Sequence, residues 1–407
     1  MEKAVIYREK EEFKEVHLVL KNATSKQFYE FSFEMEDFPN IKIKSIGNLQ
    51  ETGLTFENNR LSGIPHANSI HDLDIEFFHI HDENSTEIKK VHLLVNADPK
   101  DLWKNIPSDI NDDYYKPDEA SYKGKFSGKK ITVVSKRGRS HAHEGKFRDD
   151  DFAVDELFGG WSIVSVADGA GSAIMAREGS RLATISVNRF FSSEEILKGI
   201  EKNIETVYNT SELSKQSKAR ENIIRLMYEG VLYVYHTLDQ AATEHSFSIK
   251  DFHTTLIFAL IKKFDFGYVI LTFGVGDCPI NLISQDFSEV KLLNQMDVGE
   301  FGGGTRFITM KEIFSDDPAS RFGITCVNDF SYLVLMTDGI YDPKFMTESK
   351  LENIDSWKTF FNDLAGNNDD RVKVDFINDI HIDQQLLTWT DFWSRGNHDD
   401  RTLAIIY

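Results

Sequence analysis

Residues 161–171, WSIVSVADGAG, join an apolar run rich in β-branched residues to an aspartate and two closely spaced glycines. A run of this length and composition is typical of a buried strand. The pair Asp168-Gly169 predicts a turn at its end, because an Asp side chain can bond nearby backbone amides. Residues 173–191 then carry apolar residues at helical spacing. We therefore expect a buried strand, a tight turn and a helix.

Other runs beyond residue 129 share the strand pattern. They are KKITVVS (129–135), TTLIFALI (254–261), YVILTFGVGD (268–277), SYLVLMTDG (331–339) and TLAIIY (402–407). A second helical pattern covers residues 219–246. Long helices among hairpin-like strand pairs predict β-sheets covered by helices.

The N-terminal part alternates differently. Short strand-like segments (VHLVL 16–20, FYEFSF 28–33, DIEFFHI 74–80 and KKVHLLV 89–95) recur between turn-rich pieces. This spacing predicts a small all-β sandwich over residues 1–97. GLTF (53–56), LSGIP (61–65) and VHLLV (91–95) resemble, in that order, the immunoglobulin-like domains of many bacterial multidomain proteins. The histidines of this part do not complete a metal site, and we expect them at the surface or on edge strands: His66, His71, His79 and His81.

Residues 98–128 gather Pro, Asp, Asn and Gly and break the alternation. They predict a linker between the N-terminal domain and a second domain at 129–407. Trp103, Tyr114 and Tyr115 offer contacts that would tie this linker to one domain.

Composition limits the classes of partner. The 407 residues carry 46 Lys and Arg against 66 Asp and Glu, a net charge of −20 that repels nucleic acid and anionic lipid. Cys278 and Cys326 lie in apolar runs and predict buried thiols. The N-terminus has no signal-peptide core and no apolar run is long enough to span a membrane, so we expect a cytoplasmic protein.

Four aspartates stand where an apolar strand or its turn meets solvent. They are Asp150, Asp168, Asp338 and Asp399. Carboxylates at the ends of neighbouring strands repel one another unless a divalent cation lies between them. An Asp-Gly pair is also an ordinary turn, so each acid by itself has that simpler interpretation. Oxygen ligands favour Mg²⁺ or Mn²⁺. The sequence has no cluster of His and Cys ligands, which argues against zinc.

The order of these motifs resembles the type 2C family of metal-dependent protein phosphatases, in its bacterial branch. The shared motifs are Asp149-Asp150, Val166-Ala167-Asp168-Gly169, Thr254-Thr255 leading to Gly276-Asp277, Asp338-Gly339 and Asp399-Asp400-Arg401-Thr402. The branch is indicated by RGRSH (137–141), DGAGSA (168–173) and GEFGGGTRFIT (299–309). The resemblance implies an α+β fold, a four-layer sandwich of two antiparallel β-sheets flanked by helices.

The resemblance also implies hydrolysis of phosphoserine and phosphothreonine by in-line attack of a water that bridges two cations. Asp150, Asp168 and the carbonyl of Gly169 would hold one Mg²⁺ or Mn²⁺. Asp168, Asp338 and Asp399 would hold the other, and a third cation is an open alternative. The partners implied are a phosphorylated protein and, as an open alternative, a cognate serine/threonine kinase.

The phosphate-binding residue departs from the family pattern. Most members place an arginine before the acidic pair, where this chain has His141. His141 would bind phosphate or act as a general acid. Arg139, Arg137 and Arg148 are alternative clamps.

Two further points stay open. Asp149 or Asp151 could replace Asp150 as the metal ligand. We prefer Asp150, with Asp149 accepting a hydrogen bond from a metal-bound water. Asp400 stands where the family usually has Asn, so it cannot donate the hydrogen bonds of an amide. Residues 299–307 suggest a flap at the mouth of the site and lack the features of a nucleotide site. The alternatives to a phosphatase of proteins are a pseudophosphatase that keeps the fold for binding and a hydrolase of small phosphorylated metabolites.

Overall fold

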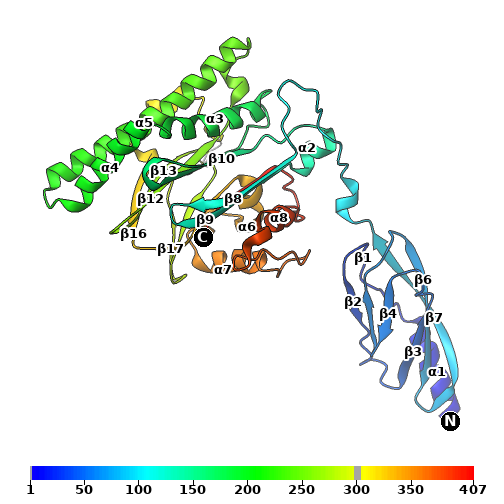
Figure 1. Ribbon diagram of the computed structural model, residues 1–407. Coiled ribbons are helices and arrows are strands. Elements are labelled where there is room, and N and C mark those ends of the chain that lie inside the picture. The colour runs from blue at the N-terminus through cyan, green and yellow to red at the C-terminus, as the bar shows by residue number, and fades with distance from the viewer. Residues whose placement is uncertain (1, 298–303) are drawn as a thin grey trace. The chain divides into compact units, whose positions relative to one another are not determined.

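The computed structural model describes residues 2–297 and 304–407 (Figure 1). The chain divides into two compact units between Lys104 and Asn105. Most of the glycine-rich stretch 299–307 lies outside the described residues. None of the described helices combines the length and the apolar character needed to cross a membrane.

The first unit contains one helix and two small sheets. Its elements are α1 (Glu2–Glu15), β1 (Ala23–Thr24), β2 (Tyr29–Ser32), β3 (Ile41–Gly47), β4 (Leu54–Glu57), β5 (Arg60–Gly63), β6 (Ile70–His79) and β7 (Asp82–Asn96). The sheets have the orders β1-β7-β6-β3 and β2-β5-β4. One core takes side chains from both sheets, among them Leu61 and Leu73. The two sheets therefore share a core, but the unit is not all-β, because it contains α1. Residues 16–20 form no strand and contribute buried Leu20 to the core.

Helix α1 was not expected from the sequence. Phe13 packs with Ile41 and Phe77 in a small separate core, because the helix lays this side chain on the sheet. His79 is 2% exposed, and its Nε2 lies 2.9 Å from the Glu9 carboxylate. The expectation of a surface histidine is wrong at His79, since α1 covers it.

The second unit contains two larger antiparallel sheets. The five-stranded sheet has the order β10 (Asp151–Glu156), β11 (Trp161–Ala167), β12 (Leu256–Phe264), β13 (Gly267–Val275) and β16 (Phe322–Val327). The six-stranded sheet has the order β15 (Val290–Leu292), β14 (Ile280–Ser284), β17 (Phe330–Met336), β18 (Arg401–Ile406), β9 (Lys129–Lys136) and β8 (Glu119–Phe126).

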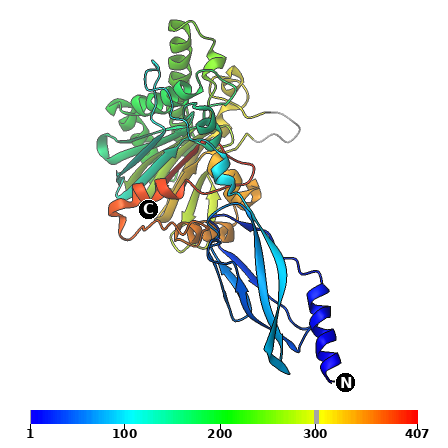
Figure 2. The ribbon, with the colours of Figure 1, turned by 90° about the vertical axis from the view of Figure 1, so that its right-hand side faces the viewer.

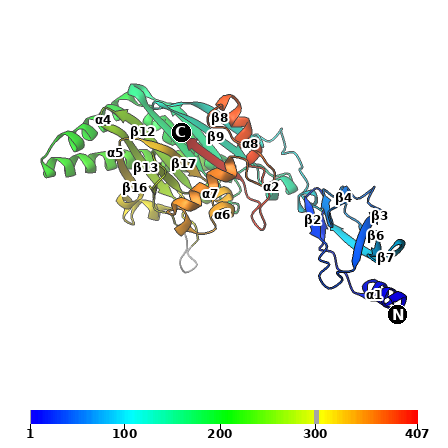
Figure 3. The same cartoon turned by 90° about the horizontal axis from the view of Figure 1, so that it is seen from below.

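Helices cover these strands on opposite sides, as Figures 2 and 3 show. They are α2 (Arg139–Glu144), α3 (Ala176–Phe191), α4 (Glu194–Asn209), α5 (Leu213–Glu244), α6 (Asp338–Phe345), α7 (Ile354–Leu364) and α8 (Ile382–Trp389). Short 3₁₀ helices lie at Pro99–Leu102, Phe158–Gly160, Ile249–Phe252, Lys311–Phe314, Pro318–Arg321, Glu348–Lys350 and Asp379–His381. The mixed α+β class predicted from the sequence is confirmed.

Three apolar cores account for this arrangement. One joins the five-stranded sheet to α3, α4 and α5, with Phe258 and Met227 among its members. A second lies between the two sheets and includes Val164 and Leu335. The third joins the six-stranded sheet to α6, α7 and α8 and includes Trp357. Both faces of each sheet are therefore buried, which explains why their strands are almost continuously apolar.

The predicted linker at 98–128 differs from what the structure shows. Residues 105–128 belong to the second unit, and β8 within them is the edge strand of the six-stranded sheet. The linker was predicted because Pro, Asp and Asn are typical of loops. In the structure residues 119–126 pair with β9, and polar side chains of residues 105–118 bond to the second unit. Tyr114 and Tyr115 do pack on that unit, against His245 and Phe147.

Candidate active site

The first two predicted acids leave the five-stranded sheet together. Asp150 directly precedes β10, and Asp168 directly follows β11. The strands pair antiparallel with Asp151 opposite Ala167. An antiparallel register therefore brings the end of one strand and the start of the other to the same edge.

The other two acids do the same in the six-stranded sheet. Asp338 begins α6 just after β17, and Asp399 lies just before β18. These strands pair antiparallel, with Met336 opposite Leu403. Gly339 is required beside Asp338, because a Cβ there would lie 1.8 Å from the carbonyl oxygen of Asp400.

Asp150 links the two sheets at this edge. It is 1% exposed, and its Oδ2 accepts hydrogen bonds from Thr337 Oγ1 at 2.8 Å and Thr402 Oγ1 at 2.7 Å. Thr402 Oγ1 in turn lies 2.6 Å from Ser135 Oγ. Thr337 directly follows β17 and Thr402 lies in β18, the two strands next to the second pair of acids. These hydroxyls therefore fix Asp150 relative to both sheets.

Asp168 is held through its backbone. Its N–H donates to Thr255 Oγ1 at 2.9 Å, and its carbonyl accepts from Thr255 N–H and Thr254 Oγ1, both at 2.8 Å. A Cβ at Gly169 would lie 2.7 Å from the carbonyl oxygen of Asp149, so the close approach of the two loops requires glycine. The side chain of Asp168 is thereby left for the acidic cluster.

The acids perturb one another strongly. Burial, then the charges of Asp338 and Asp150, raise the pKa of Asp168 well above its ordinary value. Burial, then the charges of Asp399 and Asp277, raise the pKa of Asp338 to about 7. Carboxylates this close cannot all ionise at neutral pH without a compensating charge.

The residues present fit a hard divalent cation. Asp338 Oδ1 is buried and has no hydrogen-bond partner among the residues that the structure describes. Ligand atoms of Asp168, Asp277 and Cys278 lie within 4.8 Å of one another. Burial raises the pKa of the Cys278 thiol, so this sulfur stays protonated and is a poor ligand. The oxygen atoms therefore remain the available donors, as Mg²⁺ and Mn²⁺ prefer.

Asp277 is the acid that sequence reasoning missed as a site residue. It follows β13 in a Gly-Asp turn, and its Oδ2 accepts a hydrogen bond from Thr305 Oγ1 at 2.8 Å. The signal was present, because Asp277 also stands at a strand end. The sequence analysis expected no Cys or His among the ligands, whereas the fold brings Cys278 to Asp168 and Asp277, and His141 to Asp399 and Asp400.

His141 faces Asp400 from helix α2. Its Nδ1 lies 3.1 Å from both carboxylate oxygens of Asp400, and its Nε2 lies 3.6 Å from Asp149 Oδ2. Burial by itself would lower the pKa of His141, but the hydrogen bond and charge of Asp400 raise it to about 9. Asp400 also accepts from the backbone N–H of Gly138 at 2.6 Å. The histidine and the unusual aspartate therefore form one buried ion pair.

The alternative arginine clamps are bonded elsewhere. Arg139 donates to the backbone carbonyls of Asp391 and Phe392. Arg137 donates to the carbonyls of Lys146 and Ile106. None of these four bonds involves an acid of the cluster.

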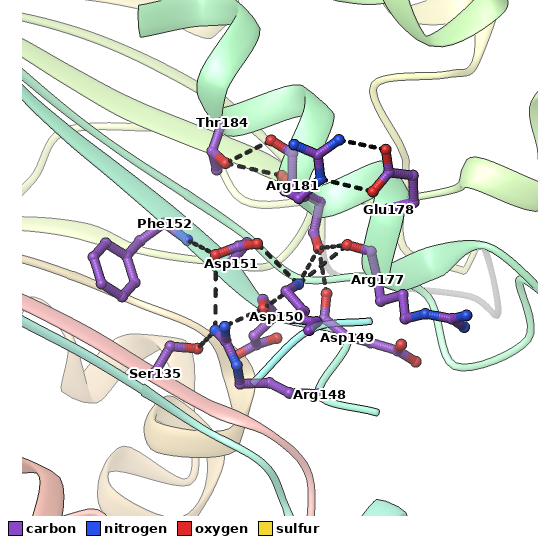
Figure 4. Close-up of polar contacts among 12 residues, drawn as sticks. Ser135, Arg148, Asp149, Asp150, Asp151, Phe152, Arg177, Glu178, Arg181 and Thr184 are labelled. Atoms are coloured by element: carbon purple, nitrogen blue, oxygen red, sulfur yellow. Dashed lines mark hydrogen bonds and ion pairs between the residues drawn. The ribbon is translucent and has the colours of Figure 1, made fainter. Parts of the chain in front are cut away.

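Arg148 lies behind the acidic loop, as Figure 4 shows. It donates to the Asp150 carbonyl at 2.9 Å and to Ser135 Oγ. Its Nη1 also lies 3.8 Å from Asp151 Oδ1, so Asp151 is paired with a cation on this side. Asp149, by contrast, faces His141.

The sequence profile of the protein phosphatase 2C family matches residues 137–388, more than half of the chain. This chain belongs to the protein phosphatase 2C family. The membership predicted from the strand-end acids is therefore confirmed. Among curated proteins, none matches the sequence.

Solved structures of several phosphatases are similar to this protein phosphatase 2C chain. The serine/threonine phosphatase Stp1 from Staphylococcus aureus is 16% identical, with 72% of this chain and 98% of that chain covered and a TM-score of 0.40. The serine/threonine phosphatase of S. agalactiae is 17% identical, with 68% and 98% covered and a TM-score of 0.39. A C. elegans sex determining protein is 12% identical, with 70% and 65% covered and a TM-score of 0.39.

Proposed function

We propose that this chain is a protein phosphatase that hydrolyses phosphoserine and phosphothreonine with two divalent cations. The observation that carries the proposal is the convergence of Asp150, Asp168, Asp338 and Asp399 at strand ends, where burial and then the charges of Asp338, Asp150 and Asp399 raise the pKa of Asp168. Two cations, when bound, would activate the attacking water and stabilise charge on the phosphoryl oxygens.

The proposed ligands follow from these contacts. Asp150, Asp168 and the Gly169 carbonyl would hold one cation, and Asp168, Asp338 and Asp399 the other. The choice of Asp150 over its neighbours is supported by its charge, which acts on Asp168. Asp151 instead pairs with Lys116 at 3.0 Å. Asp277 becomes an additional candidate ligand.

The proposed role of His141 follows from its pairing. Asp400 binds Nδ1, which fixes the ring and keeps it protonated. The Nε2 proton, on the side of Asp149, is then the one that can pass to phosphate or to the leaving serine or threonine oxygen. The Asp400 carboxylate is what makes a histidine usable at a position where the family has arginine.

We also propose a layer order for the second unit and a domain class for the first. Three stacked cores separate helices, sheet, sheet and helices, which supports a four-layer sandwich. The two sheets of the first unit, with their shared core, support an immunoglobulin-like domain. In this proposal the domain recruits a partner or substrate.

The test is release of phosphate from a phosphothreonine peptide in the presence of Mn²⁺. The Asp168→Asn variant should lose at least about a hundredfold in rate, because it removes the acid shared by both cations. Equal rates for the wild type and this variant would overturn the assignment. A nucleoside monophosphate in place of the peptide tests whether small metabolites are preferred.

A second candidate function is a pseudophosphatase that uses the fold for binding. It is favoured by the bonds that already occupy these arginines: Arg137 and Arg139 donate to backbone carbonyls away from the acids, and Arg148 donates to the backbone carbonyl of Asp150. Calorimetric titration with Mn²⁺ separates the two functions. Failure of the chain to bind any divalent cation in this titration supports the pseudophosphatase.

A further inference from the structure

The segment 105–118 lies outside the part of the chain that the family profile matches, which begins at residue 137. It is nonetheless the first part of the second unit. We call these residues the strap. Although the strap contains no strand, its side chains reach the loop that carries Asp149, Asp150 and Asp151.

Lys116 makes the central contact of the strap. It is 4% exposed, and its ammonium donates to the carbonyl oxygen of Asp150 at 2.7 Å, to that of Arg177 at 3.1 Å and to Ser180 Oγ at 3.2 Å. It also lies 3.0 Å from Asp151 Oδ2. A buried ammonium is costly unless such partners surround it, so these contacts fix the positions of all the groups involved.

The same loop is held by other groups on both sides, shown in Figure 4. Arg148 shares the Asp150 carbonyl at 2.9 Å, and Ser180 Oγ donates to the carbonyl of Asp149. The Lys116 ammonium and the Arg148 guanidinium therefore both donate to the carbonyl oxygen of Asp150. The hydroxyls of two threonines donate to the Asp150 carboxylate. Removing Lys116 would leave the Asp151 carboxylate with the longer ionic contact to Arg148 and the hydrogen bond from the Phe152 N–H.

The strap is itself anchored on helix α3 and strand β9. Arg177 donates to Asp112 Oδ1 at 2.8 Å and to the carbonyl of Tyr114 at 3.0 Å. Asp118 lies 2.9 Å from Arg137 Nη2. These ion pairs fix the backbone of the strap on both sides of Lys116, so that its side chain is directed to the loop.

We propose that Lys116 is a positioning residue of the phosphatase site, and that the strap sets the affinity for divalent cations by fixing the loop Asp149–Asp151. The inference rests on the proposed function, since it assumes that this loop supplies a ligand. A site must be held within about 0.5 Å of its productive geometry, and the side chains behind the ligands do this.

The test compares Lys116→Met with Lys125→Met in the full chain. Lys125 is an exposed lysine on β8 of the same unit, so it controls for the chemical change. Titration calorimetry with Mn²⁺ should show binding about 10- to 100-fold weaker for Lys116→Met and unchanged for Lys125→Met, as for other groups that orient metal ligands. Hydrogen–deuterium exchange of the metal-free proteins should be faster over residues 149–152 in Lys116→Met only.

The outcomes distinguish the inference from the proposed function. Wild-type Mn²⁺ affinity and wild-type exchange at 149–152 in a folded Lys116→Met protein overturn the inference and leave the phosphatase proposal intact. A wild-type chain that binds no Mn²⁺ overturns the proposed function, and the exchange rates then still decide whether Lys116 holds the loop.

A milder variant keeps the test decisive if Lys116→Met does not fold. Asp112→Asn weakens the ion pair to Arg177 but keeps the oxygen that accepts from the backbone of Tyr114. It should weaken Mn²⁺ binding several-fold and speed exchange at 149–152. If both measurements stay at their wild-type values, the result contradicts the strap's role.

Discussion

Replacing Asp338 by Asn should stabilise the metal-free protein and destabilise the metal-loaded one relative to the wild type. In the folded chain Asp338 keeps its proton up to about pH 7, whereas the unfolded side chain loses it near 3.8. Between these values the folded state binds more protons than the unfolded state. The free energy of unfolding therefore falls as pH rises through this window and the loss is complete above about pH 7.

The size of the effect follows from the pKa. A rise from 3.8 to about 7 corresponds to about 4 kcal/mol of unfavourable free energy when Asp338 ionises. Relaxation of the surrounding groups reduces this to about 2–4 kcal/mol. For a unit of this size, Asp338→Asn should then melt about 4–8 °C higher than the wild type at about pH 8 in chelator. Below about pH 3 the difference should vanish, since both states then hold the proton.

The assay is differential scanning calorimetry of the second unit's transition, in chelator and in excess Mn²⁺. Mn²⁺ should raise the melting temperature of the wild type above that of Asp338→Asn, because binding to the folded state alone stabilises it. Asp265→Asn, at an exposed turn position between β12 and β13, is the matched control and should leave both melts unchanged. Equal melting temperatures for Asp338→Asn and the wild type at about pH 8 in chelator would refute the reasoning.

Two predictions concern stability. Lys89→Met should lower the free energy of unfolding of the first unit by about 2–3 kcal/mol in urea, because the buried Lys89 ammonium donates to the carbonyls of Phe13, Lys14 and Val16 at the end of α1. Lys90→Met, at the neighbouring exposed lysine, is the control. Equal losses in the two variants would contradict the role of Lys89. Gly339→Ala should destabilise the second unit by about 3 kcal/mol, since its Cβ would meet Asp400, whereas Gly171→Ala has nothing within 4 Å and should unfold like the wild type. Calorimetric melting of both glycine variants checks this, and a wild-type melt for Gly339→Ala would count against it.

The site prediction depends on strand ends. Asp150, Asp168, Asp338 and Asp399 were selected because each follows or precedes an apolar run, and the antiparallel pairs β10–β11 and β17–β18 bring such ends together. Their roles as metal ligands stay a prediction. Asp277 satisfied the same rule and was quoted for its motif, but no role was assigned to it. The clamp was left open between His141 and three arginines, since a side chain's direction is not written in its spacing.

The predictions failed where polar side chains replace strand pairing. The segment 98–128 was expected to be a linker, because its Pro, Asp and Asn residues are those of loops. In the structure its Lys116 is buried behind the acidic loop. Likewise His79 was expected at a surface, and α1 covers it. In both places a contact between residues far apart in the chain changes the environment of the side chain.

The sequence by itself determined the α+β class of the second unit and the position of four acids at strand ends, because hydrophobic periodicity and turn residues act over short distances. The family followed from the order of the motifs. Only the tertiary structure decided that Thr337 and Thr402 donate to the same carboxylate oxygen of Asp150. It also decided that Asp400 pairs with His141 and that Lys116 of the strap bonds to the acidic loop. These contacts join residues separated by long stretches of chain, and they form only once both sheets and their helices have packed. The stretch WSIVSVADGAG thus specifies a strand and its turn, while the fold supplies the charges that raise the pKa of Asp168.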